Sequence, residues 1–281
     1  MTPQSFVVLH DVVTGDEEVV YETPDLIEAP NWSPCGTFLV LNGSGRVFRF
    51  DLGTGRVQPI DTGPLTHLNN DHGISPDGTT LLVSESPARG TSCIYALPIT
   101  GGTPRRITDL VPSYFHGWSP DGATITYTAR RNGVFHICTC PLAGGAETRL
   151  TGGPGHRDGP DYAADGQWIW FNSDHHGQTP DIWRIRTDGR DLQQITDDAL
   201  VNWFPHPSPD GQHVLYLAYP KDVLGHPRGQ EVSLNLMPQS GGAARTVAAF
   251  YGGQGSINVP NWSPDARHFA YVRYARPDVT S

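Results

Sequence analysis

A four-residue turn that recurs six times constrains this 281-residue chain more than any other feature of its sequence. The turn reads Ser-Pro-Asp-Gly with small variations, and its first residues, at intervals of 42, 44, 44, 45 and 55 positions, are Ser33, Ser75, Ser119, Ala163, Ser208 and Ser263. Proline sets φ for the first turn position, aspartate hydrogen-bonds to nearby backbone, and glycine accepts a positive φ. Tight turns at so regular a spacing predict a repeat architecture.

Each repeat has room for four short strands. A run of strand-forming residues follows each turn, as at residues 37–41. A second run, such as 46–50, leads to a glycine-containing turn, and a third ends in Ile-Thr or Leu-Thr, as at 106–108. The segment that enters the next turn supplies the fourth. Four strands in roughly 40 to 45 residues are typical of a β-propeller blade. We therefore predict an all-β fold, a six-bladed β-propeller formed by one domain over residues 1–281.

The two ends of the chain complement each other. After Ser263 only one strand-like run remains, residues 267–274, so the last blade lacks its two outer strands. The N-terminal region supplies two such runs, residues 6–10 and 18–21, which are joined by a turn. We expect strands from both termini to pair in one blade and close the ring, because closure removes the exposed edges of an open sheet.

The composition excludes several classes of protein. With 32 glycines and 25 prolines, a helix-rich fold is disfavoured. A net charge of −10 makes nucleic acid and anionic membranes poor partners. The chain has no apolar stretch long enough to insert into a membrane, and its first residues lack the features of a secretory signal. We therefore expect a cytoplasmic protein, or a periplasmic one if the sequence is N-terminally trimmed. The four cysteines form no Cys-x-x-Cys pair, which predicts reduced thiols in strands or core.

The order of elements within a repeat resembles a known family. Trp-Ser-Pro-Asp-Gly at 118–122, a β run, Ile followed by Tyr or Trp, a Gly-Gly turn and a closing Ile-Thr or Leu-Thr are similar to the propeller of TolB, across essentially the whole chain. The repeat is more distantly similar to the propellers of oligogalacturonate lyases. The first resemblance implies a module that binds a protein or peptide. The second implies a metal-using lyase, or a hydrolase, that acts on a carbohydrate or uronate.

Polar residues concentrate in the six segments that enter the turns, which we call the inner segments. In the predicted propeller these segments line the central channel, so their side chains should converge on one mouth. Three positions before the turn, two adjacent repeats carry His72 and His116 where the other four carry proline. Gly73 and Gly117 follow these histidines, and we interpret the glycines as leaving room for a ligand beside each imidazole.

Three chemistries remain open for the mouth. The first is one divalent metal, such as zinc, manganese, iron or calcium, held by His72, His116 and His206 with support from Asp158 or Asp161. The second is acid–base catalysis by His116 and Asp158, with Arg157 stabilising an anion. The third is binding of a polar ligand, for which the predicted contacts are Glu28, Asn31, Asn70, Asp71, Tyr114, His156, Asp161, Trp203, Asn258 and Asn261. The same residues are also compatible with a water-filled channel in which they only bond loop backbone.

We favour a protein that binds or acts on a small polar ligand, carbohydrate-like or uronate-like, at this mouth. The alternative is a non-catalytic module that binds a peptide in the manner of TolB. The long fifth repeat predicts a loop between 219 and 231 that projects over the mouth. We interpret the His175-His176 pair as a solvent-exposed loop. Large rings just before the turns are interpreted as packing between blades. Several arginines on loops either attract an anionic ligand or are simply solvated. The rings are Trp32, Trp118, Tyr162 and Trp262, and the arginines are Arg89, Arg130, Arg131 and Arg228.

Overall fold

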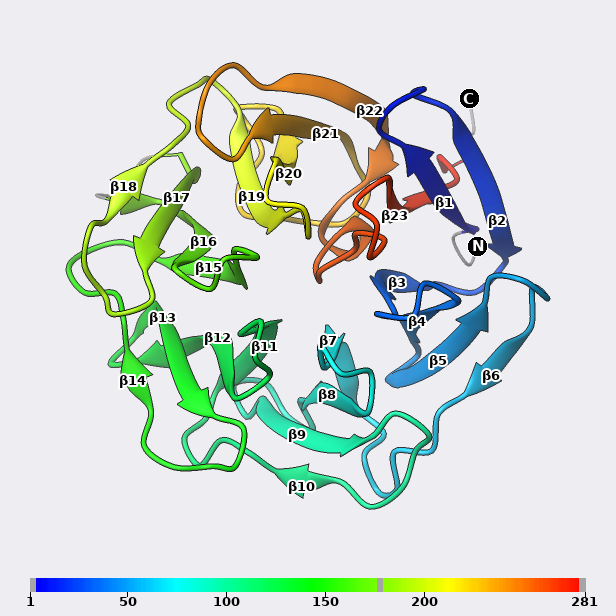
Figure 1. The fold of residues 1–281 in the computed structure, drawn as a ribbon, viewed down its shortest axis with the longest axis horizontal. Helices are drawn as coiled ribbons and strands as arrows, with labels where there is room; N and C mark the ends of the chain where they lie inside the picture. The colour runs from blue at the N-terminus through cyan, green and yellow to red at the C-terminus, as the bar shows by residue number, and fades with distance from the viewer. Residues whose placement is uncertain (1–3, 176–178, 278–281) are drawn as a thin grey trace.

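The computed structural model describes residues 4–175 and 179–277. Six antiparallel sheets surround a central axis, and the chain proceeds around the ring blade by blade (Figure 1). The predicted six-bladed β-propeller is confirmed. Within the described ranges, no helix is long and apolar enough to cross a membrane.

Five blades are four-stranded, and each has its first strand nearest the axis (Figure 1). The strands of blades one and two are β3 (Glu28–Trp32), β4 (Phe38–Gly43), β5 (Arg46–Asp51), β6 (Val57–Pro59), β7 (Leu68–Ile74), β8 (Thr80–Glu85), β9 (Cys93–Pro98) and β10 (Arg105–Arg106). The strands of blades three and four are β11 (Ser113–Trp118), β12 (Thr124–Arg131), β13 (Val134–Pro141), β14 (Thr148–Arg149), β15 (Arg157–Tyr162), β16 (Trp168–Ser173), β17 (Asp181–Arg186) and β18 (Gln193–Gln194). The strands of blade five are β19 (Val201–Pro207), β20 (His213–Tyr219), β21 (Gln230–Pro238) and β22 (Arg245–Gly252).

Blade six closes the ring with strands from both termini, as predicted. Its sheet has the order β2 (Glu17–Thr23), β1 (Ser5–Asp11) and β23 (His268–Tyr274), in which β1 pairs with both neighbours. The predicted inner strand of this blade is instead a 3-10 turn, η2 (Gln254–Ser256), and a bridge between Trp262 and Phe269. Because β1 is the middle strand of this sheet, the N-terminal segment is an integral part of the ring.

The recurring turn works as its residues predict. In the second repeat, the Ser75 hydroxyl accepts the Thr80 backbone N–H at 2.9 Å and donates to Asp77 at 2.5 Å. The Asp77 carboxylate also accepts the Thr79 N–H at 3.0 Å. Gly78 has φ of 73°, which favours glycine. Side-chain hydrogen bonds of this kind fix the register with which each inner strand pairs with the next strand.

Apolar side chains fill the space between neighbouring blades. Between blades two and three, for example, a buried cluster contains Leu82, Ile94, Phe115, Ile125 and Tyr127. Burial of a side chain of this size stabilises a fold by about 1.5 to 3 kcal/mol. Each inner strand is therefore packed on both flanks, which fixes the positions of the residues that line the channel.

The cysteines are free, and three of the four are buried. Cys35 differs from the prediction, because it lies exposed in the first turn, at the position where the other five turns carry aspartate. The hydroxyls of Ser33 and Thr37 stabilise the thiolate and lower the pKa of Cys35 to about 7.

Candidate functional site

A cavity of about 580 Å³ opens at the end of the channel away from the Ser-Pro turns, and we call this end the mouth. Its wall comes from the inner strands β3, β7 and β11, from β4 and η2, and from loops of blades one, two and five. The charged, amide and phenolic side chains of its lining are Glu28, Asp71, Arg228, Asn42, Asn69, Asn70, Gln254 and Tyr114. A polar cavity of this size falls within the range of small-ligand sites.

The inner segments contribute four of the predicted ligand contacts to this cavity: Glu28, Asn70, Asp71 and Tyr114. Sequence reasoning missed Asn42 and Gln254, because both lie outside the inner segments. For Asn42 a signal was available: it lies at the end of β4, next to the loop between the second and third strands, and such loops share a face with the mouth.

Asp71 is a carboxylate held beside this cavity with little access to water. It is 5% exposed, and the Asn258 amide donates a 2.6 Å hydrogen bond to it. Burial is the main cause that raises the pKa of Asp71 to about 6; the charge of Asp158 acts in the same direction, whereas His116 opposes it. Perturbed carboxylates beside a cavity are typical of functional sites.

His116 on β11 and Asp158 on β15 form an ion pair between neighbouring blades, with Nε2 and Oδ1 3.3 Å apart. Burial by itself lowers the pKa of His116, but the hydrogen bond to Asp158 and the charges of Asp71 and Asp158 raise it. Burial also opposes ionisation of Asp158, but its hydrogen bond to His116 and the charge of that ring lower the pKa of Asp158 to about 2. The two predicted catalytic groups therefore meet, and Asp158 is ionised at neutral pH.

The long loop between β20 and β21 places an imidazole and a guanidinium beside carboxylates of the inner strands. His226 Nε2 lies 3.6 Å from Asp158 Oδ2, and Arg228 Nη1 lies 3.3 Å from Glu28 Oε1. The His226 ring also covers Trp203, with 4.3 Å between ring centroids. Trp203 is 9% exposed, so this predicted ligand contact is covered by the protein's own loop.

The three predicted metal ligands do not converge. His72 is fully buried, and its Nε2 lies 3.1 Å from the Val40 carbonyl in blade one. Burial lowers the pKa of His72 to about 4, so this ring is neutral at physiological pH. His116, at the equivalent position of the next blade, instead faces Asp158. Equivalent sequence positions thus direct their imidazoles to different partners.

His206, the third predicted ligand, is part of a buried belt that links neighbouring inner strands. Its Nδ1 lies 3.0 Å from Asp161 Oδ2, and its Nε2 lies 2.6 Å from the Ile257 carbonyl. Both ring nitrogens are therefore engaged within the fold. Among residues 4–175 and 179–277, no group of three or more His, Cys, Asp or Glu side chains is arranged to hold a metal ion. The predicted three-histidine centre does not fit the structure.

Two asparagines complete this belt two positions before the turns. Asn31 donates to the Pro260 carbonyl at 2.6 Å and accepts the Ile74 N–H at 2.8 Å. Asn261 donates to the Ala270 carbonyl at 2.7 Å. These predicted ligand contacts instead serve as hydrogen bonds within the ring.

Gly73 and Gly117 do not make room for a ligand, contrary to our interpretation. A Cβ on Gly73 would lie 2.5 Å from the Phe115 ring of the next blade. A Cβ on Gly117 would lie 3.0 Å from Asp161 Oδ1 and from the Pro160 carbonyl oxygen. The reason is close packing, because adjacent inner strands approach each other at these two positions.

Arg157 does not serve as an anion ligand in this structure. It is 2% exposed, and its guanidinium donates to the carbonyls of Gly152 and Gly155 at 2.9 and 2.7 Å. The side chain therefore holds the loop that enters β15. His175 Nδ1 lies 3.3 Å from Arg157 Nη2, and His176 lies outside the described residues.

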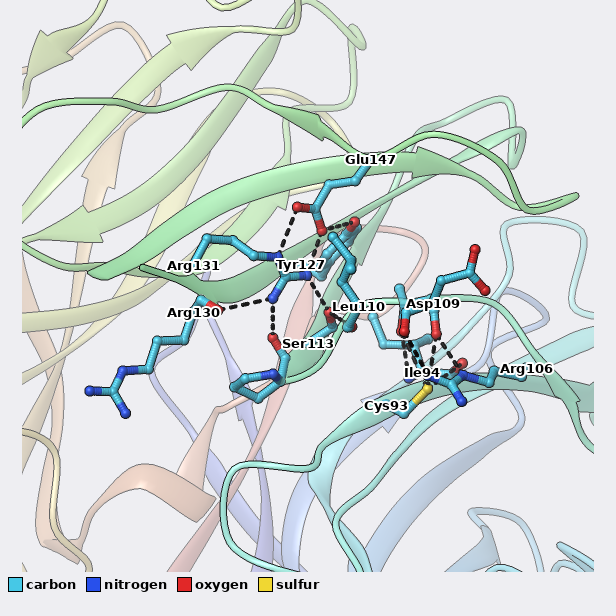
Figure 2. Close-up of polar contacts among 12 residues, drawn as sticks. Cys93, Ile94, Arg106, Asp109, Leu110, Ser113, Tyr127, Arg130, Arg131 and Glu147 are labelled. Atoms are coloured by element: carbon cyan, nitrogen blue, oxygen red, sulfur yellow. Dashed lines mark hydrogen bonds and ion pairs between the residues drawn. The ribbon is translucent and has the colours of Figure 1, made fainter. Parts of the chain in front are cut away.

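Two further candidates for ligand contact are engaged elsewhere. His156 accepts the Phe135 backbone N–H at 3.1 Å. Arg131 belongs to a network on blade three, shown in Figure 2, where Glu147 accepts two of its hydrogen bonds at 2.6 and 2.9 Å. The Tyr127 hydroxyl also donates to Glu147 at 2.8 Å. This arginine therefore braces its own blade and is not free to attract an anion.

The chain is similar in sequence and structure to several known proteins. The family model of the TolB beta propeller domain matches residues 112–225. An uncharacterized protein of Agrobacterium fabrum is 50% identical over 272 residues, which cover 96% of this chain and 92% of that one. A solved structure from Agrobacterium tumefaciens, provisionally assigned to TolB, is 48% identical with a TM-score of 0.95, and the match covers 99% of this chain and 100% of that one.

More distant relatives share less. The Tol-Pal system protein TolB of Francisella tularensis subsp. mediasiatica is 27% identical over 157 residues, which cover 55% of this chain but only 34% of that protein. An oligogalacturonate lyase solved in complex with manganese is 13% identical with a TM-score of 0.60, covering 98% of this chain and 97% of that one. At that identity, the likeness to the lyase concerns the fold alone.

Proposed function

Because this chain belongs to the TolB-like β-propeller family, we propose that it binds a small polar ligand in the cavity at its mouth. The observation that carries the proposal is Asp71, a carboxylate of the cavity lining whose pKa burial raises to about 6. An ionised group in such surroundings costs stability unless a partner compensates it. A ligand that donates hydrogen bonds to Asp71 offsets that cost. In a purely structural channel, a buried carboxylate at this position would bring only the cost.

The charges of the mouth favour a neutral ligand over a uronate. Glu28 and Asp71 both line the cavity, and Arg228 is already paired with Glu28 at 3.3 Å. A further carboxylate on the ligand would meet Asp71, and the described lining of the cavity offers no cation other than the paired Arg228 to balance it. Amides such as Asn42 and Asn69 both donate and accept hydrogen bonds, which suits the hydroxyl groups of a neutral sugar.

The environment of His116 favours ligand binding over catalysis as the role of the site. Its ring is 3% exposed, stacks on Phe204 with 6.2 Å between centroids, and directs Nε2 to Asp158. A general acid or base must come within hydrogen-bonding reach of the reacting atoms. Lyase or hydrolase activity by this pair therefore requires the loop that carries His226 to move, and turnover is one outcome of the test.

A second candidate ligand is a peptide with a free N-terminus. The observation that favours it is the acidic character of the mouth, because an ammonium group would complement Asp71. The likeness to TolB proteins is compatible with this candidate.

Calorimetric titration with galactose, galacturonate, trialanine and N-acetyl-trialanine tests the proposal. We expect galactose to bind and Asp71→Asn to weaken it about tenfold, the usual effect of a lost charge-assisted hydrogen bond. Glu18→Gln is the matched control, because Glu18 is an exposed carboxylate on β2 outside the mouth cavity.

Each outcome of this titration decides between the candidates. Binding of trialanine alone, lost on acetylation, selects the peptide. Tighter binding of galacturonate than of galactose contradicts the charge argument. Heat that continues after saturation, with a new product in solution, indicates turnover. If no probe binds, the proposal that the mouth is a ligand site fails.

A further inference from the structure

A second cavity, of about 380 Å³, opens at the opposite end of the channel, among the Ser-Pro turns. We call it the turn-end socket. Its wall includes four aromatic side chains that occupy the same position in their repeats, directly before the turn: Trp32, Trp118, Tyr162 and Trp262. Prolines of the turns form its rim. Sequence reasoning assigned these rings to packing between blades, and the structure shows that they also face an open cavity.

Two of these rings are fixed by hydrogen bonds to the neighbouring blade. The Trp118 indole N–H donates to the Gly73 carbonyl at 3.3 Å, and the Trp262 indole N–H donates to the His206 carbonyl at 2.9 Å. Their polar atoms are thereby satisfied inside the fold. What remains for the socket is aromatic carbon, held in place without a ligand.

Carboxylates lie in the socket lining or next to it in the chain: Asp161 is a lining residue, and an aspartate directly follows each of the lining prolines Pro76, Pro120 and Pro209. The third position of the turns is aspartate in five of the six repeats: Asp77, Asp121, Asp165, Asp210 and Asp265. Hydrogen bonds from the turn serine and from backbone N–H groups lower the pKa of Asp77, Asp121 and Asp265, so these carboxylates stay ionised. Among the lining residues of the described chain, none is lysine, arginine or histidine.

We propose that the turn-end socket binds a cationic side chain, arginine or lysine, presented by a basic segment of a partner protein. Aromatic faces attract a cation by their quadrupole, and Trp does so most strongly. The alkyl stem of such a side chain suits the aromatic and proline walls, while the ring of turn carboxylates complements its charge. An uncharged apolar side chain fits the same walls but gains nothing from the carboxylates.

This site is independent of the proposed function. The inner-segment residues that line the mouth cavity lie at least four positions before the turns, as Asp71 and Glu28 do, whereas those of the socket lie at most three positions before them, as Pro260 and Asn31 do. The belt that contains His206 contributes Asn31 and Asp161 to the socket lining, and none of its members lines the mouth cavity. A variant at one end should therefore leave binding at the other unchanged.

Titration with three pentapeptides of sequence acetyl-Gly-Ser-X-Ser-Gly-amide tests the proposal. Position X is arginine, citrulline or norleucine, so charge and apolar stem are varied separately. We expect the arginine peptide to bind most tightly and to shift the indole N–H signals of Trp118 and Trp262 in nitrogen-15 spectra. Its affinity should fall as the salt concentration rises, because the turn carboxylates are exposed.

Two variants and one control locate the binding. The double variant Asp77→Asn, Asp121→Asn keeps an acceptor oxygen in both turns and removes two charges, and we expect about fivefold weaker binding at low salt. Tyr162→Leu keeps an apolar wall but removes one aromatic face, with an expected loss of about threefold. Glu28→Gln at the mouth should have no effect. Thermal unfolding of each variant verifies the fold.

Several results would overturn the proposal. Equal or tighter binding of the norleucine or citrulline peptide shows that charge is not recognised. If Glu28→Gln weakens binding of the arginine peptide and the turn variants do not, the peptide binds at the mouth instead. Absence of binding by all three peptides at millimolar concentration removes the proposed site.

Discussion

At the mouth, the channel is lined by carboxylates, amides and a phenol, whereas at the turn end it is lined by tryptophan, tyrosine and proline. The same inner strands build both ends. In all five of them the pairing register shifts in the middle, as between Glu28 and Asn31 on β3 or between Trp203 and His206 on β19. The irregularity separates the residues that face the mouth from those that face the turns.

This difference teaches how one repeat can carry two unlike surfaces. The turn end is repetitive, because each repeat places an aromatic ring or another apolar residue at the same position before its turn. The mouth is not repetitive, since the residues five positions before the turns are Glu28, Asn70, Tyr114, Asp158, Trp203 and Asn258. Folding depends on the residues repeated at the turn end. The residues at the mouth are not constrained by the repeat in this way, so they can differ from blade to blade and form a binding site.

The largest effect should come from breaking the ring that holds both ends. Deletion of residues 1–23 removes β1 and β2 and leaves β23 without its partner strand. We expect the truncated protein to lose cooperative thermal unfolding, because blade six retains a single full strand. Addition of a peptide of residues 1–24 in trans is the control and should restore part of the transition. Cooperative melting of the truncated protein near the wild-type temperature would contradict the closure.

An intermediate effect should come from the belt between the two ends. His206→Ala leaves Asp161 buried without its 3.0 Å partner, and removal of one member of a buried pair costs about 3 kcal/mol or more. We expect the free energy of unfolding in urea to fall by that amount and ligand binding at both ends to weaken. His213→Ala, a half-buried histidine of the same blade, should change stability much less. Equal losses for the two variants would argue against the belt.

The smallest effect distinguishes the two ends by the sign of their pH dependence. The pKa of Asp71 rises from 3.8 to about 6 on folding, so its contribution to stability is present below pH 4 and is lost as pH rises through 6. Asp71→Asn should therefore raise the free energy of unfolding at pH 7 by about 1 to 3 kcal/mol while it weakens ligand binding.

Asp77 at the turn end is the matched control for this measurement. The hydrogen bond from Ser75 lowers the pKa of Asp77, so its contribution is present above its unfolded pKa and is lost as pH falls. Asp77→Asn should therefore slightly destabilise the protein at pH 7, the opposite sign to Asp71→Asn. If both variants destabilise the protein equally, the ionised Asp71 carboxylate does not cost stability at pH 7, and the argument that marks it as functional fails.

The sequence by itself determined the architecture. The spacing of the turns sets the number of blades, and the incomplete last repeat sets the closure, because these features depend on local hydrogen bonds such as Ser75 to Asp77 and on strand counting. The polar character of the mouth also follows from the inner segments. Four predicted contacts, including Asp71 and Tyr114, line the cavity.

Only the tertiary structure decided which of these side chains meet. His72 and His116 occupy equivalent positions, yet one bonds the Val40 carbonyl and the other pairs with Asp158. Asp71 owes its hydrogen bond to Asn258, a residue 187 positions away. The physical reason is that the hydrogen-bond partners and packing neighbours of each inner side chain come from adjacent blades. Burial, charge and pKa at the channel are therefore set by contacts between repeats, which the pattern within one repeat does not specify.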